Sequence, residues 1–319
     1  MADALPDAKC EGLLRGHTDV VLALCTHPTL PLLVSGSRDH TVRVWDLESR
    51  SLLRTLTGHR NAVERLALDP SGTRLASGSI DRTIRLWDLG SGECIRTHDM
   101  KGIGTLGDVY GMAWEATGRY LASVSDETYI RLWDGDSGEL RETLAGHLDE
   151  VKVLVAHPEK DLFASGSDDR TVRVWRFTTG ALLHTLVGHT KEVRSLAASN
   201  AWLVSGSWDR SLRVWSWETG RCARVIEQFA GSPRSLAWRD SRMVVLDVEN
   251  HGASVTPRVW NTGSSDPEDP EDPEAFSYVT SLKQTAFTHS VALERGRVVV
   301  PVIDWGRRGC TYAAVVWRV

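Results

Sequence analysis

Short apolar runs alternate with polar turns along almost the whole chain. In the first unit the runs cover 20–26, 32–37, 41–46 and 51–57, and Gly, Asp, Asn and Ser separate them. Such runs are typical of β-strands joined by tight turns. Residues of alternating polarity in 41–45 place Val42 and Val44 on one sheet face and Arg43 and Trp45 on the other. No segment longer than ~10 residues has a 3.6-residue apolar period, so almost no helix is expected.

Tryptophan recurs at the ends of these runs. The spacings along the series are 42, 46, 42, 40, 45 and 57 residues, near the ~40–45 of a four-stranded propeller blade. The sequence around each Trp also repeats, since residues 34–47 resemble residues 76–89, 164–176 and 204–216. The recurring residues are Trp45, Trp87, Trp133, Trp175, Trp215, Trp260 and Trp317.

These repeats, with a Gly-His pair before four of them, resemble the WD40 (WD repeat) family. The resemblance covers nearly the whole chain and is strongest in units 1, 2, 4 and 5. It implies an all-β fold, a seven-bladed β-propeller, formed by one domain over residues 1–319. Residues 10–15 match the fourth run of other units, and 313–319 match a third run. We therefore expect the N-terminal strand to complete the last blade, which would leave no open sheet edge.

Ser, His and Asp recur with each Trp in four units, and a catalytic triad is one interpretation. Four equivalent copies argue against a single active site. The resemblance implies instead a buried hydrogen-bond chain that fixes strand packing, so no catalytic residue is assigned and the protein is not expected to be an enzyme. Units 3, 6 and 7 depart from this pattern and need other partners or packing alone. The predicted network contains His17, Ser35, Asp39, Trp45, His59, Ser77, Asp81, Trp87, His147, Ser165, Asp169, Trp175, His189, Ser205, Asp209 and Trp215.

Charge and composition narrow the function classes. The net charge is −5, and six acids between 264 and 274 account for it, since without them it would be +1. Residues 262–274 (TGSSDPEDPEDPE) read as a flexible, acidic, Pro-rich loop within blade 6, or as a docking segment for a basic partner. The missing basic tract argues against nucleic-acid binding.

The cysteines, the histidines and one glycine-rich segment do not predict a cofactor. Five cysteines without a CxxC pair favour a cytoplasmic or nuclear compartment with reduced thiols, and no membrane-length apolar run or secretory signal is present. The histidines outside the Gly-His pairs lack metal-ligand spacing, so no metal is expected. Residues 102–107 fit GxGxxG, but a strand-like segment follows where a nucleotide-binding fingerprint needs a helix.

Loops at one end of the central channel are the candidate binding surface, because family members commonly bind peptides there. Blades 5 to 7 offer Trp and Arg at these positions, which favours an acidic or phosphorylated segment with Trp208 as an apolar anchor. Blades 2 to 4 offer mainly acids, including Asp126 and Asp168. The predicted partner-binding residues are Arg38, Glu64, Tyr110, Lys152, Arg194, Trp208, Arg234, Trp305 and Arg307, with Val21 at the first-strand start of blade 1.

A non-catalytic protein–protein interaction scaffold, a subunit of a larger complex, is the function that this pattern favours. The alternative is a substrate-recognition or adaptor subunit of a ubiquitin ligase, although Trp45, Trp87 and Trp133 are not followed by the WDxR sequence of cullin-linked receptors. An enzyme would need a unique polar cluster in the channel.

Overall fold

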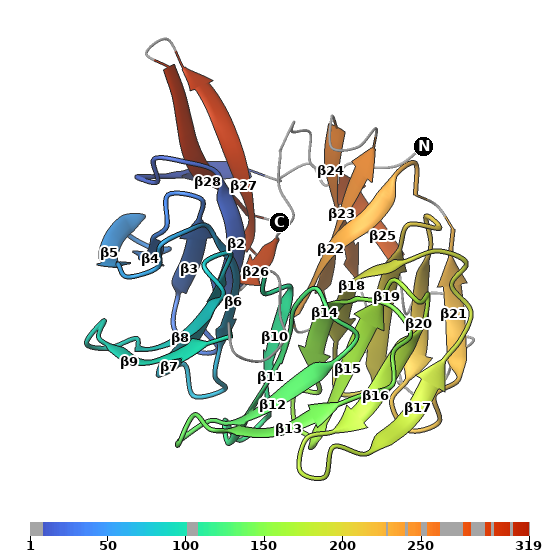
Figure 1. The fold of residues 1–319 in the computed structure, drawn as a ribbon. Coiled ribbons are helices and arrows are strands. Elements are labelled where there is room, and N and C mark those ends of the chain that lie inside the picture. Colours follow the sequence, from blue (N-terminus) through green and yellow to red (C-terminus); the bar gives the residue numbers. More distant parts are fainter. Residues whose placement is uncertain are drawn as a thin grey trace.

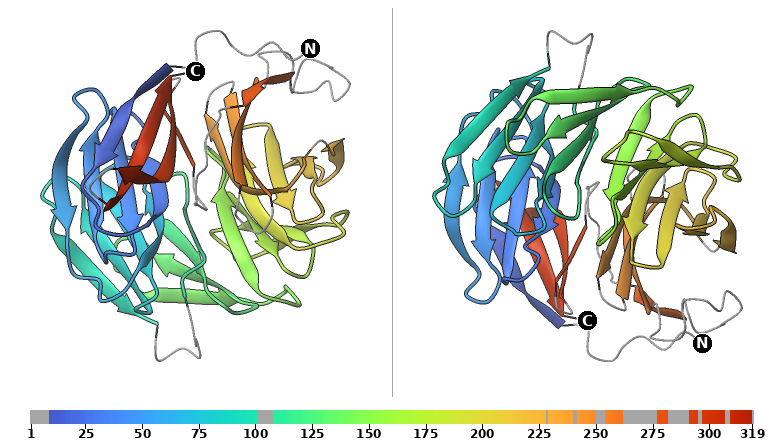
Figure 2. Two further views of the ribbon diagram at one scale, coloured as in Figure 1. Left: turned by 90° about the horizontal axis from the view of Figure 1, so that it is seen from above. Right: turned by 90° about the horizontal axis from the view of Figure 1, so that it is seen from below.

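The computed structural model describes residues 9–100, 108–227, 229–239, 242–249, 254–261, 277–281, 291–294, 297–306 and 309–318. These residues form antiparallel sheets of four strands each, and none of them lies in a helix. The sheets are arranged radially around a common centre (Figures 1 and 2).

Blades 1 to 3 each follow the four-run pattern of the sequence, and the first strand of each lies nearest the centre. Blade 1 contains β2 (Val21–Thr26), β3 (Leu32–Ser37), β4 (Val42–Asp46) and β5 (Ser51–Leu56). Blade 2 contains β6 (Val63–Leu68), β7 (Arg74–Ser79), β8 (Thr83–Asp88) and β9 (Cys94–Asp99). Blade 3 contains β10 (Gly111–Trp114), β11 (Tyr120–Val124), β12 (Ile130–Asp134) and β13 (Leu140–Leu144).

Blades 4 to 6 continue the same order, with longer strands in blade 6. Blade 4 contains β14 (Val151–Ala156), β15 (Leu162–Ser167), β16 (Val172–Arg176) and β17 (Leu182–Leu186). Blade 5 contains β18 (Val193–Ala198), β19 (Trp202–Ser207), β20 (Leu212–Ser216) and β21 (Cys222–Ile226). Blade 6 contains β22 (Ser232–Arg239), β23 (Arg242–Glu249), β24 (Ser254–Asn261) and β25 (Ser277–Ser281).

The expectation of seven blades needs a correction. Six sheets are continuous blades of four consecutive strands, whereas the remaining sheet has the order β1-β28-β27-β26 and combines both ends of the described chain. The ring is therefore six continuous blades plus this closing sheet. Its strands are β1 (Lys9–Arg15), β26 (Ala292–Glu294), β27 (Arg297–Gly306) and β28 (Gly309–Arg318).

Contacts around the centre run from each innermost strand to the next, and β26 contacts both β22 and β2. β1 pairs antiparallel with β28, so that Leu13 lies opposite Val315 and Arg15 opposite Ala313. The β27–β28 hairpin is long and extends beyond the neighbouring sheets (Figure 1). The closing sheet therefore has four antiparallel strands like the blades, but it takes its fourth strand, β1, from the other end of the described chain.

The core lies between adjacent sheets rather than inside any one of them. One apolar cluster, for example, joins Val34 and Val44 of blade 1 to Leu75 and Trp87 of blade 2. Each sheet is apolar on both faces and needs a neighbour on each side, which is the physical reason for a ring.

Candidate functional site

The recurring Trp, Ser, His and Asp side chains meet in one hydrogen-bond chain per repeat. In the first, Trp45 Nε1 donates to Ser35 Oγ at 2.8 Å, and His17 Nε2 lies 2.7 Å from the same oxygen. His17 Nδ1 lies 2.7 Å from Asp39 Oδ2. Because the carboxylate only accepts, the Nδ1 carries the proton and Nε2 accepts from the serine hydroxyl.

Three further copies have almost the same geometry. Trp–Ser distances are 2.8 Å in each, and His–Asp distances are 2.9, 2.7 and 2.8 Å. The serine and histidine side chains are buried in all of them, so no copy presents a nucleophile to solvent. The three copies use His59, Ser77, Asp81 and Trp87; His147, Ser165, Asp169 and Trp175; and His189, Ser205, Asp209 and Trp215.

Close packing explains the glycine of the Gly-His pair. A Cβ added at Gly16 would lie 2.5 Å from Arg43 Nη1 and 3.1 Å from the Trp45 ring. The glycine therefore lets the histidine loop lie directly on the third strand of the blade.

Asp81→Ala is expected to lower the free energy of unfolding by roughly 1–3 kcal/mol, because it leaves buried His59 without an acceptor. Asp81 also accepts from the Arg60 backbone N–H and from Thr83 Oγ1. Urea unfolding followed by tryptophan fluorescence measures the change. Asp88→Ala is a control, since Asp88 ends β8 of the same blade and its carboxylate accepts from the Ser91 backbone N–H, close by in the sequence. Equal losses in the two variants would contradict a special role for the buried chain.

Blades 3 and 6 contain ion pairs where the histidine chain is missing. In blade 3, Arg131 Nη2 lies 2.7 Å from Glu127 Oε2, and Trp133 Nε1 still donates to Ser123 Oγ at 2.8 Å. In blade 6, Arg258 Nη2 lies 2.8 Å from the fully buried Asp247. Arg131, Asp247 and Arg258 were not identified from the sequence, although an arginine two positions before the blade Trp is common to the repeats.

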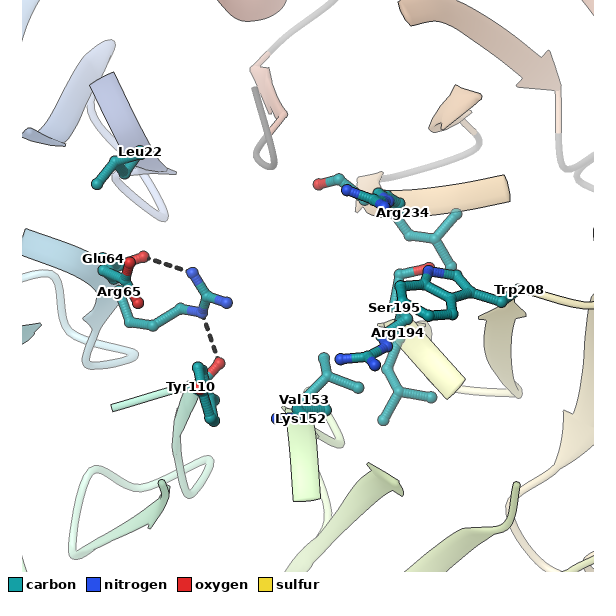
Figure 3. Close-up of a pocket in the computed structure, with 13 residues that line it drawn as sticks. Leu22, Glu64, Arg65, Tyr110, Lys152, Val153, Arg194, Ser195, Trp208 and Arg234 are labelled. Carbon is teal, nitrogen blue, oxygen red and sulfur yellow. Dashed lines mark hydrogen bonds between the residues drawn. The ribbon is translucent and has the colours of Figure 1, made fainter. Parts of the chain in front are cut away.

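A pocket of about 380 Å³ lies where the innermost strands begin. It is lined by six of the predicted partner-binding residues, which come from blades 2 to 6 (Figure 3). These six are Glu64, Tyr110, Lys152, Arg194, Trp208 and Arg234.

Bulges in the innermost strands place several of these side chains. The register of β6, β14, β18 and β22 shifts at one residue each. The extra residue of a bulge turns its side chain out of the normal alternation. The four residues at the shifts are Glu64, Lys152, Arg194 and Arg234.

In blade 1 the residue at the channel entrance is Leu22 and not Val21, which was predicted from the sequence. Val21 is buried at 3% exposure, and the register shift of β2 falls on Leu22, which lines the pocket. Matching Val21-Leu22-Ala23-Leu24 to Val63-Glu64-Arg65-Leu66 would have identified it. Arg65 also lines the pocket and was not predicted from the sequence. Its Nε donates to the Tyr110 carbonyl at 2.5 Å, and its Nη1 donates to the Glu64 carbonyl at 2.7 Å (Figure 3).

Two arginines lie over one indole on the blade 5 and 6 side. Arg194 Cζ is 4.3 Å and Arg234 Cζ 5.5 Å from the Trp208 ring. Such contacts are attractive and orient the guanidinium groups. Trp208 therefore supports two cations, and is not simply the open apolar anchor expected from the sequence. Burial, together with the charge of Arg194, lowers the pKa of Arg234 from its ordinary value.

Glu64 lines the opposite side of the pocket, and burial raises the pKa of this and other carboxyls around the channel entrance. Burial raises the pKa of Glu64 and of Asp108, and the charge of nearby Asp126 adds to the effect at Asp108. Burial also raises the pKa of Asp168, against the opposing charge of Arg194. The pocket thus has Glu64 beside Arg65 on one side and Arg194 with Arg234 on the other.

Lys152 lies between these two sides. Its Nζ is 4.0 Å from the centre of the Tyr110 ring and forms an ion pair with Glu150. Burial and the charge of Asp108 raise the pKa of the Tyr110 phenol. The lysine charge is therefore already engaged within the protein.

The remaining predicted residues lie elsewhere. Arg38 is exposed in the turn between β3 and β4 and does not line the pocket. Trp305 belongs to β27, but its side chain is outside the described part of the structure, as are Arg307, the acidic loop 262–274 and the GxGxxG segment 102–107.

Within the described ranges no three His, Cys, Asp or Glu side chains are grouped so as to hold a metal ion. Among the same residues, no helix has the length and apolarity needed to cross a membrane.

Sequence similarity to known proteins is limited to stretches about as long as one repeat. The chain is 43% identical over 54 residues to a Lissencephaly-1 homolog of Dictyostelium discoideum, covering 17% of this chain and 13% of that protein. It is 45% identical over 42 residues to WD repeat-containing protein 90 of Xenopus tropicalis, covering 13% and 2%. The aligned part thus spans far less than two thirds of these relatives' lengths.

Similarity of fold extends further. The solved structure of U3-55K superposes with a TM-score of 0.78 at 21% identity, covering 98% of this chain and 99% of that one. The family model described as "WD domain, G-beta repeat" matches residues 8–46, 50–88, 92–134, 138–176 and 180–216. Together with the repeated Trp–Ser–His–Asp chains, this match shows that the protein belongs to the WD40-repeat family of β-propellers.

Proposed function

We propose that this WD40 propeller is a non-catalytic scaffold that binds an acidic or phosphorylated segment of a partner protein at the channel entrance. The observation that carries the proposal is the pair of arginines held over Trp208 in a half-enclosed pocket. Guanidinium groups bind carboxylates and phosphates through charge-assisted hydrogen bonds.

Rigidity of the surroundings supports this proposal. The side chains project from strands whose positions are fixed by the ring, so that little order is lost when a partner binds. Tryptophan and arginine are also the residue types most enriched at interface hot spots. The polar groups repeated in several blades, by contrast, are buried and engaged with one another.

The proposal includes membership of a larger complex in the cytoplasm or nucleus. The free thiols of Cys25, Cys94 and Cys222 in the described structure support this part of the proposal, because reduced cysteines are typical of these compartments.

Affinity purification followed by mass spectrometry tests the binding surface. We expect the double variant Trp208→Ala/Arg194→Ala to lose partners that the wild-type protein retains, because it removes one cation and the support of the other. Arg221→Ala is the matched control, since Arg221 is an exposed arginine of the same blade, in the turn between β20 and β21. Thermal unfolding of each variant checks that the ring is intact. An unchanged partner set for a folded double variant would refute the proposed surface.

A further inference from the structure

Arg234 lines the pocket without a counter-charge in the described part of the chain. Its guanidinium contacts the ring of Trp208, as does that of Arg194. Arg194 also forms an ion pair with Asp168, whose Oδ2 lies 3.2 Å from Arg194 Nη2. Among the described residues no carboxylate pairs with Arg234, and no hydrogen bond holds its guanidinium. The two arginines thus share one indole but differ in their charge balance.

The described lining carries more positive than negative charge. Its charged side chains are Glu64, Arg65, Lys152, Arg194 and Arg234. Glu64 lies close enough to Arg65 for the two charges to interact, and Lys152 forms an ion pair with Glu150. Since Asp168 offsets Arg194 from outside the lining, the remaining surplus of positive charge lies at Arg234.

We propose that Arg234 is the specificity-determining residue of this pocket, and that its unbalanced charge makes the site prefer a phosphorylated serine or threonine side chain to a carboxylate. The inference rests on the proposed function, since it concerns the ligand of the same site. It also makes binding depend on phosphorylation of the partner.

Coulomb attraction gives the physical reason. A phosphorylated side chain brings about −1.5 to −2 charges at neutral pH, whereas a carboxylate brings about one. Attraction to a site of net positive charge grows with the charge of the ligand, and a half-buried pocket screens it less than water does. Burial and the charge of Arg194 lower the pKa of Arg234, so a bound anion also relieves a repulsion between the two arginines.

The shared chemistry of the ligand is a phosphomonoester, which inorganic phosphate resembles. We assign the group to a side chain of a partner protein because the pocket opens where the innermost strands begin, beside half-buried Trp208. A peptide backbone next to the phosphate adds contacts with the indole and with the apolar lining, and tryptophan is a residue type enriched at interface hot spots.

The test uses capped tripeptides, acetyl-Gly-X-Gly-amide, in which X is phosphoserine, the methyl ester of phosphoserine, glutamate or glutamine. The methyl ester keeps the tetrahedral phosphate but carries a single charge. Binding is followed by the NMR signal of the Trp208 indole N–H, which is assigned by its absence in Trp208→Phe. We expect the phosphoserine peptide to bind about tenfold more tightly than the ester or the glutamate peptide. The glutamine peptide should not bind, and inorganic phosphate should bind more weakly than the phosphoserine peptide.

Arg234→Ala is expected to weaken binding of the phosphoserine peptide about tenfold and to bring the phosphoserine and glutamate Kd values to within about threefold of each other. The reason is that the remaining arginine is already offset by Asp168. Arg221→Ala is the matched control, because this arginine is exposed in blade 5 and does not line the pocket. Thermal unfolding of each variant checks that the ring is intact.

The outcomes separate the inference from the proposed function. Equal wild-type Kd values for the phosphoserine and glutamate peptides, or for phosphoserine and its methyl ester, would overturn the preference for the higher charge. An unchanged Kd ratio in a folded Arg234→Ala variant would overturn the role of Arg234. Inorganic phosphate that binds as tightly as the phosphoserine peptide would overturn the assignment to a partner side chain.

The proposed function would still stand in the first case if Arg234→Ala bound both charged peptides more weakly than the wild-type protein does. A wild-type protein that binds none of the peptides would refute the binding site and the inference together.

Discussion

Deleting residues 1–15 is expected to remove cooperative folding of the whole ring at 37 °C. The deleted segment includes β1, which pairs with β28 along its length. Leu14 of this strand is 2% exposed and packs in a cluster with Leu33 and Trp45 of blade 1, while Leu13 packs against the cluster of blade 6 and the closing sheet. One short strand therefore joins two neighbours that are otherwise far apart in the sequence.

The expected loss is several kcal/mol, because a buried leucine and a row of ladder hydrogen bonds are removed together. That amount is comparable with the whole ~5–15 kcal/mol by which domains are usually stable. Deletion also exposes an unpaired strand edge, which promotes aggregation.

Thermal unfolding by circular dichroism measures this effect. Deletion of residues 1–8 alone, which precede β1, is the matched control and should leave the transition nearly unchanged. Addition of a peptide of residues 1–15 to the longer deletion should restore a cooperative transition. A longer deletion that unfolds at the wild-type temperature would contradict the role of β1 in closing the ring.

Acidification is expected to destabilise the protein through the four aspartates that accept a hydrogen bond from a buried histidine. Burial alone would raise the pKa of Asp39, Asp81, Asp169 and Asp209, but hydrogen bonds from the paired histidine and from a neighbouring threonine or serine outweigh it and hold each pKa below the ordinary range. A carboxyl with a depressed pKa in the folded state stabilises the protein above its unfolded pKa. This stabilisation is lost as the pH falls below about 4.

Urea unfolding at pH 7, 5 and 3 tests the prediction. The free energy of unfolding should be similar at pH 7 and 5 with respect to these carboxyls and clearly lower at pH 3. In Asp81→Asn the protein starts less stable, but its further loss on acidification should be smaller, because three titrating chains remain instead of four. A wild-type protein as stable at pH 3 as at pH 7 would show that the carboxyls are not stabilised in this way.

Much of the ring could be predicted because the residues that stabilise a blade lie close together in the sequence, within one repeat. The Trp45–Ser35–His17–Asp39 chain uses residues at most 28 positions apart, and the same letters recur in three further units. The polar contact of blade 6 was harder to predict, because it is an ion pair of Asp247 and Arg258 and not a Trp–Ser–His–Asp chain. A different pair of residues can satisfy the same burial requirement, and composition alone does not show which pair does so.

The pocket was predicted in part. Glu64, Lys152, Arg194 and Arg234 could be placed because a repeat fixes where each innermost strand begins. The bulges in these strands could not be predicted. For this reason Val21 was predicted at the entrance, whereas Leu22 lines the pocket. Strand periodicity has no marker for an extra residue, so an error of one position reverses which side chain faces the channel.

The family, the strand pattern and the repeated buried chains could all be predicted from the amino-acid sequence, because they depend on residues within one repeat. The folded chain was needed to show that Trp208 supports two arginines and that Asp168 lies against one of them. The Trp208–Arg234 and Asp168–Arg194 contacts join different blades, and the distance between blades depends on how every sheet packs around the centre. Pairwise charge interactions across such interfaces therefore have no local pattern in the sequence.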